Sequence, residues 1–135
     1  MRIALPPGLL RRLKSEDTEQ IAAFDYFRAK ALTDPRYRRI WHPANEGKCS
    51  KLYGLIQQLK GKRKGVSDVV VSHPVDPIHG AYIELKTGKE QPSREQVAWL
   101  DDMRNAGYFC AVVWGADQLM STVDGYLLLD RKKPG

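Results

Sequence analysis

The sequence predicts an α/β domain in which a small mixed β-sheet is flanked by helices. Helical segments with caps or an apolar stripe alternate with short runs of β-branched and aromatic residues. Two of those runs flank a turn-rich loop, as in a hairpin, and a helical segment joins the second run to a third, as in a crossover between parallel strands. We expect the order helix, helix, strand, strand, helix, strand, helix.

The chain has 135 residues, enough for one hydrophobic core but not for two. We therefore expect a single domain over residues 1–135, with a core of about residues 15–128 and loose ends. We see no internal repeat that would suggest an array of smaller units.

The first helix is expected from Ser15, a suitable N-cap followed by acids, to about Leu32, where Asp34-Pro35 ends it. At about 100° per residue, Glu16 falls in the middle of the apolar stripe of this helix, whereas Glu19 projects toward its edge. Glu16 is therefore the acid that we expect to point at a buried site. The alternative is that acids of the first turn only oppose the helix dipole.

Residues 36–50 show no clear period and are expected to be irregular, with a turn at Asn45-Glu46-Gly47. Residues 51–60 are expected to form a second helix, weakened by Gly54 and closed by Gly61.

A hairpin should come next. Asp68 opens the β-branched run of residues 69–71, and the loop of residues 72–80 contains prolines, an aspartate and a glycine. The apolar residues 81–83 then lead into Glu84-Leu85-Lys86. The two ends of the hairpin bring Asp68 near Glu84.

A third helix opens at Ser93, which has a capping-box spacing to Gln96, and closes at Gly107. Residues 108–114 are continuously apolar and predict a buried strand, parallel to the strand of Glu84. The last helix is expected over residues 116–128.

The carboxylates of this hairpin predict a metal site. Side chains alternate along a strand, so Glu84 and Lys86 share one face and Leu85 takes the other. Two carboxylates held together repel unless a cation lies between them, and a hard ion such as Mg²⁺ prefers oxygen ligands. Lys86 would stand beside a metal-bound water. Gln96 has two interpretations: its amide completes the capping box, or it reaches a scissile phosphate or Lys86.

The charge predicts a polyanionic partner. Lys and Arg number 22 against 16 acids, a net charge of +6. The basic residues cluster at Arg36-Arg38-Arg39, at 60–64 and at 131–133, which suits a phosphate backbone. A solvated surface is the other interpretation, and we prefer it for the tail at 131–133.

Other chemistries find less support. Cys49 and Cys110 lack a CxxC spacing and are expected to be reduced. His42, His73 and His79 lack the spacing of a zinc site and are expected to be loop residues. Nucleotide-binding glycine motifs are missing, and we find no signal peptide or membrane span, so we expect a cytoplasmic protein.

Taken together, the motifs resemble the virus-type replication-repair nuclease (VRR-NUC) domain, a branch of the PD-(D/E)XK nuclease superfamily. The resemblance runs from Ser15 to about Leu128. It rests on the ordered segments Glu16 through Gln20, Gly65-Val66-Ser67-Asp68, Tyr82-Ile83-Glu84-Leu85-Lys86, Ser93-x-x-Gln96-x-x-Trp99-Leu100 and Gly107-Tyr108. Two departures are Ser67, where the family usually has proline, and Asn45-Glu46-Gly47, where it has Asn-Gly-Gly.

The resemblance implies a restriction-endonuclease-like core, with Asp68 and Glu84 as metal ligands and Lys86 as the catalytic lysine. It also implies that Glu16 is the acid carried by the first helix and that Gln96 supports the site. Small stand-alone members resemble phage or prophage proteins that dimerise and cut branched DNA, including four-way junctions, in the cytoplasm of a bacterial host.

Our hypothesis is a metal-dependent DNA endonuclease. Asp68, Glu84 and the Leu85 carbonyl would bind Mg²⁺ or Mn²⁺, and Glu16 would join directly or through water. Lys86 would orient the attacking water or neutralise developing charge. Two alternatives stay open: a nicking or restriction-like endonuclease on ordinary duplex DNA, and a DNA-binding accessory module with a nuclease fold that does not cleave.

Overall fold

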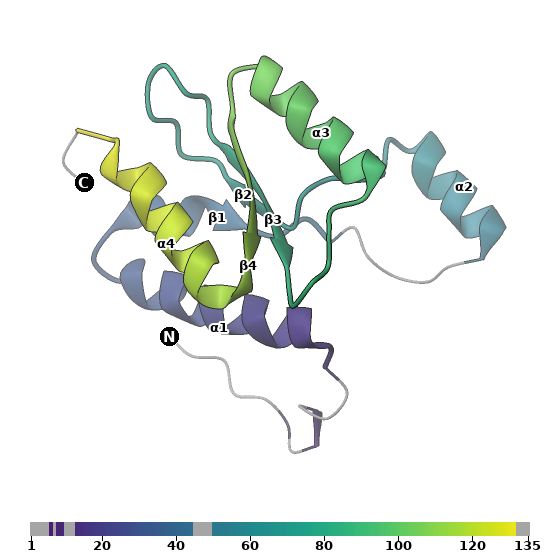
Figure 1. Ribbon diagram of the computed structural model, residues 1–135, viewed down its shortest axis with the longest axis horizontal. Coiled ribbons are helices and arrows are strands. Elements are labelled where there is room, and N and C mark those ends of the chain that lie inside the picture. The colour runs from purple at the N-terminus through teal and green to yellow at the C-terminus, as the bar shows by residue number, and fades with distance from the viewer. Residues whose placement is uncertain (1–5, 7, 10–12, 45–49, 132–135) are drawn as a thin grey trace.

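The computed structural model describes residues 6, 8–9, 13–44 and 50–131 (Figure 1). The predicted turn at residues 45–47, Cys49 and the last two residues of the basic tail lie outside these ranges. The elements in order are α1 Ser15–Lys30, the 3-10 helix η2 Pro35–Arg39, β1 Ile40–Trp41, α2 Lys51–Leu59, β2 Val69–Val71, β3 Ala81–Lys86, α3 Arg94–Asn105, β4 Phe109–Trp114 and α4 Gly115–Leu128.

The sheet has four strands in the order β1-β2-β3-β4. β2 and β3 form the predicted antiparallel hairpin, in which Val69 pairs with Ile83. β3 and β4 are parallel over six residue pairs, and α3 is the crossover between them. The predicted α/β class with a small mixed sheet is thereby confirmed.

The structure corrects the prediction that residues 36–50 are irregular. The Asp34 carboxylate accepts a hydrogen bond from the Arg36 amide at 3.0 Å, and the turn that it caps is η2. Ile40 and Trp41 then form β1, antiparallel to β2, with Ile40 opposite Val71. A strand of two residues has no period to detect, so only its pairing with β2 defines it.

Helices cover both faces of the sheet. α1 and α4 pack on the face to which Ile83 and Leu85 contribute fully buried side chains, with Phe27 from α1 and Leu119 from α4 in the same core. α3 lies on the other face, where the ring of Trp99 meets that of Tyr82 edge to face at 5.5 Å. Figure 1 shows these layers. Leu85 and Glu84 therefore point to opposite faces, as the alternation of strand side chains requires.

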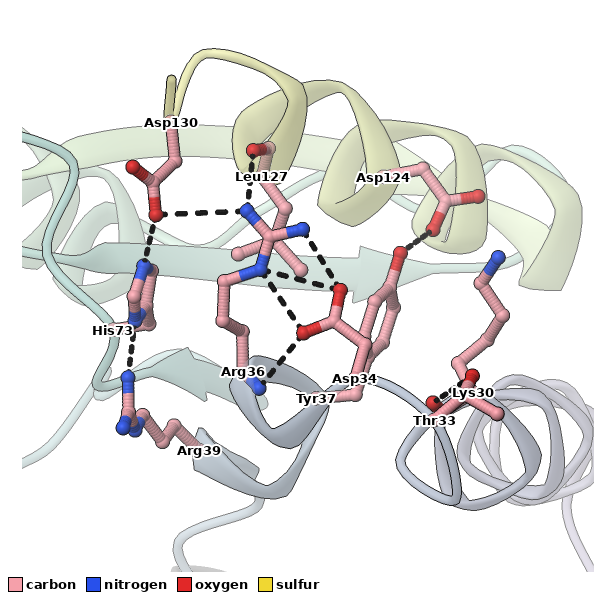
Figure 2. A network of polar contacts seen from close by, with 10 residues as sticks. All are labelled: Lys30, Thr33, Asp34, Arg36, Tyr37, Arg39, His73, Asp124, Leu127 and Asp130. Carbon is pink, nitrogen blue, oxygen red and sulfur yellow. Dashed lines mark hydrogen bonds and ion pairs between the residues drawn. The ribbon is translucent and has the colours of Figure 1, made fainter. Parts of the chain in front are cut away.

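A partly buried polar network joins η2, the segment after β2 and the end of α4 (Figure 2). Arg36 pairs with Asp34 at 2.8 Å and reaches Asp130 at 3.5 Å. His73 lies between Asp130, whose Oδ2 is 2.6 Å from Nε2, and Arg39, whose Nη1 is 2.5 Å from Nδ1. A guanidinium can only donate, so Nδ1 of His73 is the acceptor and Nε2 carries the proton.

His73 lies in the loop after β2, as predicted, but it is only 9% exposed and is not a surface residue of that loop. Its imidazole links three segments that are far apart in the sequence, and none of them has a local signal for the contact. Cys110 is a buried free thiol, as expected.

One helix stands apart from the layers. α2 lies at one end of the molecule, beyond the N-terminal end of α3 (Figure 1), and none of its residues is buried. Its N-cap Ser50 accepts a hydrogen bond from the Tyr53 amide at 3.1 Å. Five large apolar side chains on it are 43% to 78% exposed: Leu52, Tyr53, Leu55, Ile56 and Leu59. Within the described ranges, no helix has the length and apolar character needed to cross a membrane.

Candidate active site

Asp68 stands one residue before β2 and is held from two sides. Its Oδ2 accepts a hydrogen bond from the Leu85 amide of β3 at 2.9 Å. Its backbone carbonyl lies 2.5 Å from Nδ1 of His42, which must carry the proton because a carbonyl only accepts. The side chain is 7% exposed. The carboxylate therefore has a fixed orientation at the start of the hairpin.

Glu84 lies on β3 opposite Asp68 in the hairpin register and is 1% exposed. Its Oε1 accepts a hydrogen bond from Nε2 of Gln96 at 2.8 Å and lies 3.5 Å from Nζ of Lys86. Its Oε2 is buried without a hydrogen-bond partner among the described residues. A buried carboxylate oxygen with no partner is costly, so this position calls for a proton or a cation.

The pKa of Glu84 is raised above the ordinary value of a glutamate. Burial is the largest cause, because it disfavours the charged form, and the negative charge of the neighbouring Asp68 carboxylate adds to it. Lys86 acts in the opposite direction. The predicted pair of carboxylates, Asp68 and Glu84, is therefore close enough for electrostatic repulsion between them.

Gln96 satisfies two requirements with one side chain. Its Oε1 accepts a hydrogen bond from the Ser93 amide at 2.8 Å, while Ser93 Oγ accepts one from the Gln96 amide at 3.2 Å. This is the predicted capping box of α3. The NH₂ group of the same side chain donates to Glu84. In the described structure, the side chain of Gln96 therefore contacts Glu84 and not Lys86. The sequence offered no signal for the contact between Gln96 and Glu84.

The start of α1 lies at the end of β3. Ser15 is the first residue of the helix and not its N-cap, and its hydroxyl is 3.1 Å from that of Thr87. Figure 1 shows this end of α1 beside the end of β3. Glu16 is partly buried in this turn, and its role as a metal ligand stays a prediction. Glu19 is engaged elsewhere, because its Oε2 accepts a hydrogen bond from the Ala116 amide at the start of α4 at 2.6 Å.

The donor set suits a magnesium-like ion. In the described part of the chain, no group of three or more His, Cys, Asp or Glu side chains is placed to hold a metal. Mg²⁺ is usually bound by one or two carboxylates and keeps several waters. Asp68 and Glu84 supply two carboxylates, and the unpartnered Oε2 of Glu84 supplies a vacant acceptor. These residues therefore fit Mg²⁺ or Mn²⁺.

A hollow of about 150 Å³ opens beside Asp68, lined by His42, Pro43, Gly65, Val66, Ser67, Asp68 and Gln96. Gly65 has a positive φ of 82°, and a Cβ there would lie 2.4 Å from the backbone of Glu95. Only glycine allows the loop to approach α3 this closely. Sequence reasoning did not identify His42 and Gly65 as parts of the site wall, because both contacts are tertiary.

Comparisons with known proteins agree with this architecture. The family model described as the VRR-NUC domain matches residues 14–117. A solved structure described as a "VRR_NUC domain protein" is 22% identical, with a TM-score of 0.72 over 86% of this chain and 90% of that chain. At this identity the structural likeness shows the fold alone. No curated protein matches the sequence.

Proposed function

Because the chain belongs to the VRR-NUC domain family, whose nuclease-type fold acts on DNA, we propose that it is a metal-dependent endonuclease that hydrolyses phosphodiester bonds in DNA. The observation that supports this most is the buried pair of Asp68 and Glu84, with one carboxylate oxygen unpartnered and Lys86 alongside. A purely structural carboxylate would have its hydrogen bonds satisfied.

Each residue of the site has a proposed role. Asp68, Glu84 and the Leu85 carbonyl would hold Mg²⁺ or Mn²⁺, with Glu16 joining directly or through water. When bound, such an ion supplies Lewis acidity and a water of lowered pKa. The Leu85 amide and Gln96 keep the two carboxylates oriented. Lys86 would neutralise charge that develops on the phosphate oxygens, and in-line hydrolysis would leave a 5′-phosphate.

For the substrate we propose branched DNA such as a four-way junction, cut by a homodimer. The exposed apolar side chains of α2 support self-association, because large exposed apolar patches mark surfaces that contact another molecule. A twofold dimer presents two equivalent sites to two strands. A nicking or restriction-like activity on ordinary duplex DNA is the alternative, and a gel of linear, nicked, flap and four-way substrates separates them. Monomeric mass by light scattering would count against the dimer.

The activity is tested with supercoiled plasmid and a four-way junction in Mg²⁺. Asp68→Asn keeps the shape of the side chain but removes its charge, and we expect no cleavage. Asp101→Asn is the matched control, because Asp101 lies on the surface and pairs only with Arg104 in the described structure. Equal cutting by both variants and the wild type would show that the proposed site is wrong.

A second candidate is a DNA-binding module that keeps the nuclease fold but does not cleave, and the net charge of +6 supports DNA binding as such. Titration calorimetry with Mn²⁺ distinguishes the two. The enzyme binds the ion and Asp68→Asn does not, whereas a binding module takes up DNA equally with and without metal and shows no heat of metal binding.

A further inference from the structure

A second concave surface lies next to the active site, between α2 and the loop that follows it. It is a trough of about 640 Å³, several times larger than the hollow at Asp68. Its described lining is Ser50, Lys51, Gly54, Leu55, Gln57, Gln58, Lys62, Arg63, Lys64 and Gly65. The lining includes four cationic side chains and two amides but no carboxylate. Such a surface attracts anions.

The two walls of the trough have different origins. One wall is a side of α2, on which Gln57, Gln58 and the apolar Leu55 lie around Gly54. A glycine inside a helix is destabilising, and here it leaves this wall without a side chain at its middle. The other wall is the loop of Lys62 and Lys64, and in the described structure neither lysine takes part in an ion pair. Their charges are available to a ligand.

The trough leads into the active site. Gly65 lines both the trough and the hollow that contains Asp68. Its backbone lies close against the N-terminal turn of α3, at Glu95 and Gln96. A polymer that lies in the trough can therefore continue past Gly65 to Asp68 without a side chain of residue 65 in its way.

The chemistry of the lining indicates which part of a nucleic acid binds here. Proteins that hold single strands stack the bases on aromatic side chains, and the described lining has none. Lysines and side-chain amides instead bind phosphate and sugar oxygens without reading sequence. We propose that the trough binds the sugar-phosphate backbone of a duplex arm adjacent to the bond that is cut. The position of this duplex arm beside the bond that is cut rests on the proposed function, whereas the binding of DNA in the trough does not.

The test measures DNA binding in EDTA. Without a metal ion no cleavage takes place, so Asp68 does not have to be substituted. A labelled duplex and the matching single strand are titrated with wild type and with Lys62→Ala/Lys64→Ala, and anisotropy is followed at several salt concentrations. Each phosphate contact contributes about −0.9 to the slope of log K against log salt for duplex DNA. Loss of two contacts should make that slope shallower by about 1.8, to a similar extent for unrelated sequences.

The control removes the same charge at the other end of the molecule. Lys30 is the last residue of α1, and Arg131 follows α4; both of those helix ends lie opposite α2 in Figure 1. Lys30→Ala/Arg131→Ala should keep the wild-type slope. An unchanged slope for the trough variant, or an equal change in the control, would overturn the proposal. An equal or larger loss on the single strand would overturn the assignment to duplex.

The binding experiment and the cleavage assay can refute their hypotheses independently of each other. A protein that binds duplex through the trough in EDTA but never cuts refutes the proposed nuclease activity and leaves the trough intact. A protein that cuts but shows no change of slope refutes only the trough. Thermal unfolding of both double variants verifies that each one is folded before binding is measured.

Discussion

The double role of Gln96 can be separated by three substitutions. Ser93→Ala removes only the cap, because the hydroxyl of Ser93 is the acceptor for the Gln96 amide. Gln96→Ala removes the cap carbonyl and the donor to Glu84 together. Gln96→Glu retains a carboxylate oxygen for the capping box, which accepts glutamate as well as glutamine, but replaces the amide donor facing Glu84 by a carboxylate.

The magnitudes follow from these contacts. Loss of a Ser N-cap costs about 1 kcal/mol of unfolding free energy. At neutral pH without metal, the raised pKa of Glu84 keeps its carboxyl group protonated, so the contact with Gln96 joins two neutral groups. Such a hydrogen bond contributes about 0.5–1.5 kcal/mol. We therefore expect losses of about 1 kcal/mol for Ser93→Ala, about 1.5–2.5 kcal/mol for Gln96→Ala and about 0.5–1.5 kcal/mol for Gln96→Glu.

The assay is urea unfolding at neutral pH in EDTA, followed by DNA cleavage in Mg²⁺ with each folded variant. Ser93→Ala should cut at close to the wild-type rate, whereas both Gln96 variants should be slower, because Glu84 loses its orienting contact. The reasoning is refuted if Gln96→Ala costs no more stability than Ser93→Ala and cuts equally fast. In that case Gln96 would be a helix cap and nothing more.

Three further predictions concern the surroundings of the site. Gly65→Ala places a Cβ 2.4 Å from backbone at a positive φ and should lower the thermal midpoint well below that of Gly61→Ala, which meets open space; equal midpoints would contradict the close approach. Because folding raises the pKa of Glu84 from 4.5 to about 9, the folded state holds this proton more tightly, so the contribution of Glu84 to stability in EDTA is complete below pH 4.5 and is lost as pH rises toward 9. The unfolding free energy of Glu84→Gln should lack this pH dependence. If urea titrations show the same decline for the variant and the wild type between pH 4.5 and 9, the prediction is wrong. His73→Ala removes the hydrogen bonds of the imidazole to Asp130 and Arg39 and should lower the unfolding free energy in urea by about 1.5–3 kcal/mol, and a cost under about 0.5 kcal/mol would show the contacts of Figure 2 to be solvated.

Local signals in the sequence were sufficient for most elements. The spacing from Ser93 to Gln96 predicts the start of α3, and the same two residues form the capping box in the structure. Alternation along residues 81–86 predicts that Glu84 and Leu85 face opposite sides, and Leu85 is indeed in the core while Glu84 meets α3. These predictions hold because caps and strand alternation depend on residues a few positions apart.

Only the tertiary structure decided the surroundings of those residues. β1, the buried position of His73 and the contact of Gln96 with Glu84 each join segments that no period or cap relates. Burial of Glu84 depends on α3 covering its face of the sheet, and the trough exists because α2 stands away from the layers. The sequence alone thus determined which acids and which lysine lie together on the hairpin. Packing between distant segments determined that one carboxylate oxygen is left buried and unpartnered, because desolvation is a property of everything around an atom and not of its neighbours in the chain.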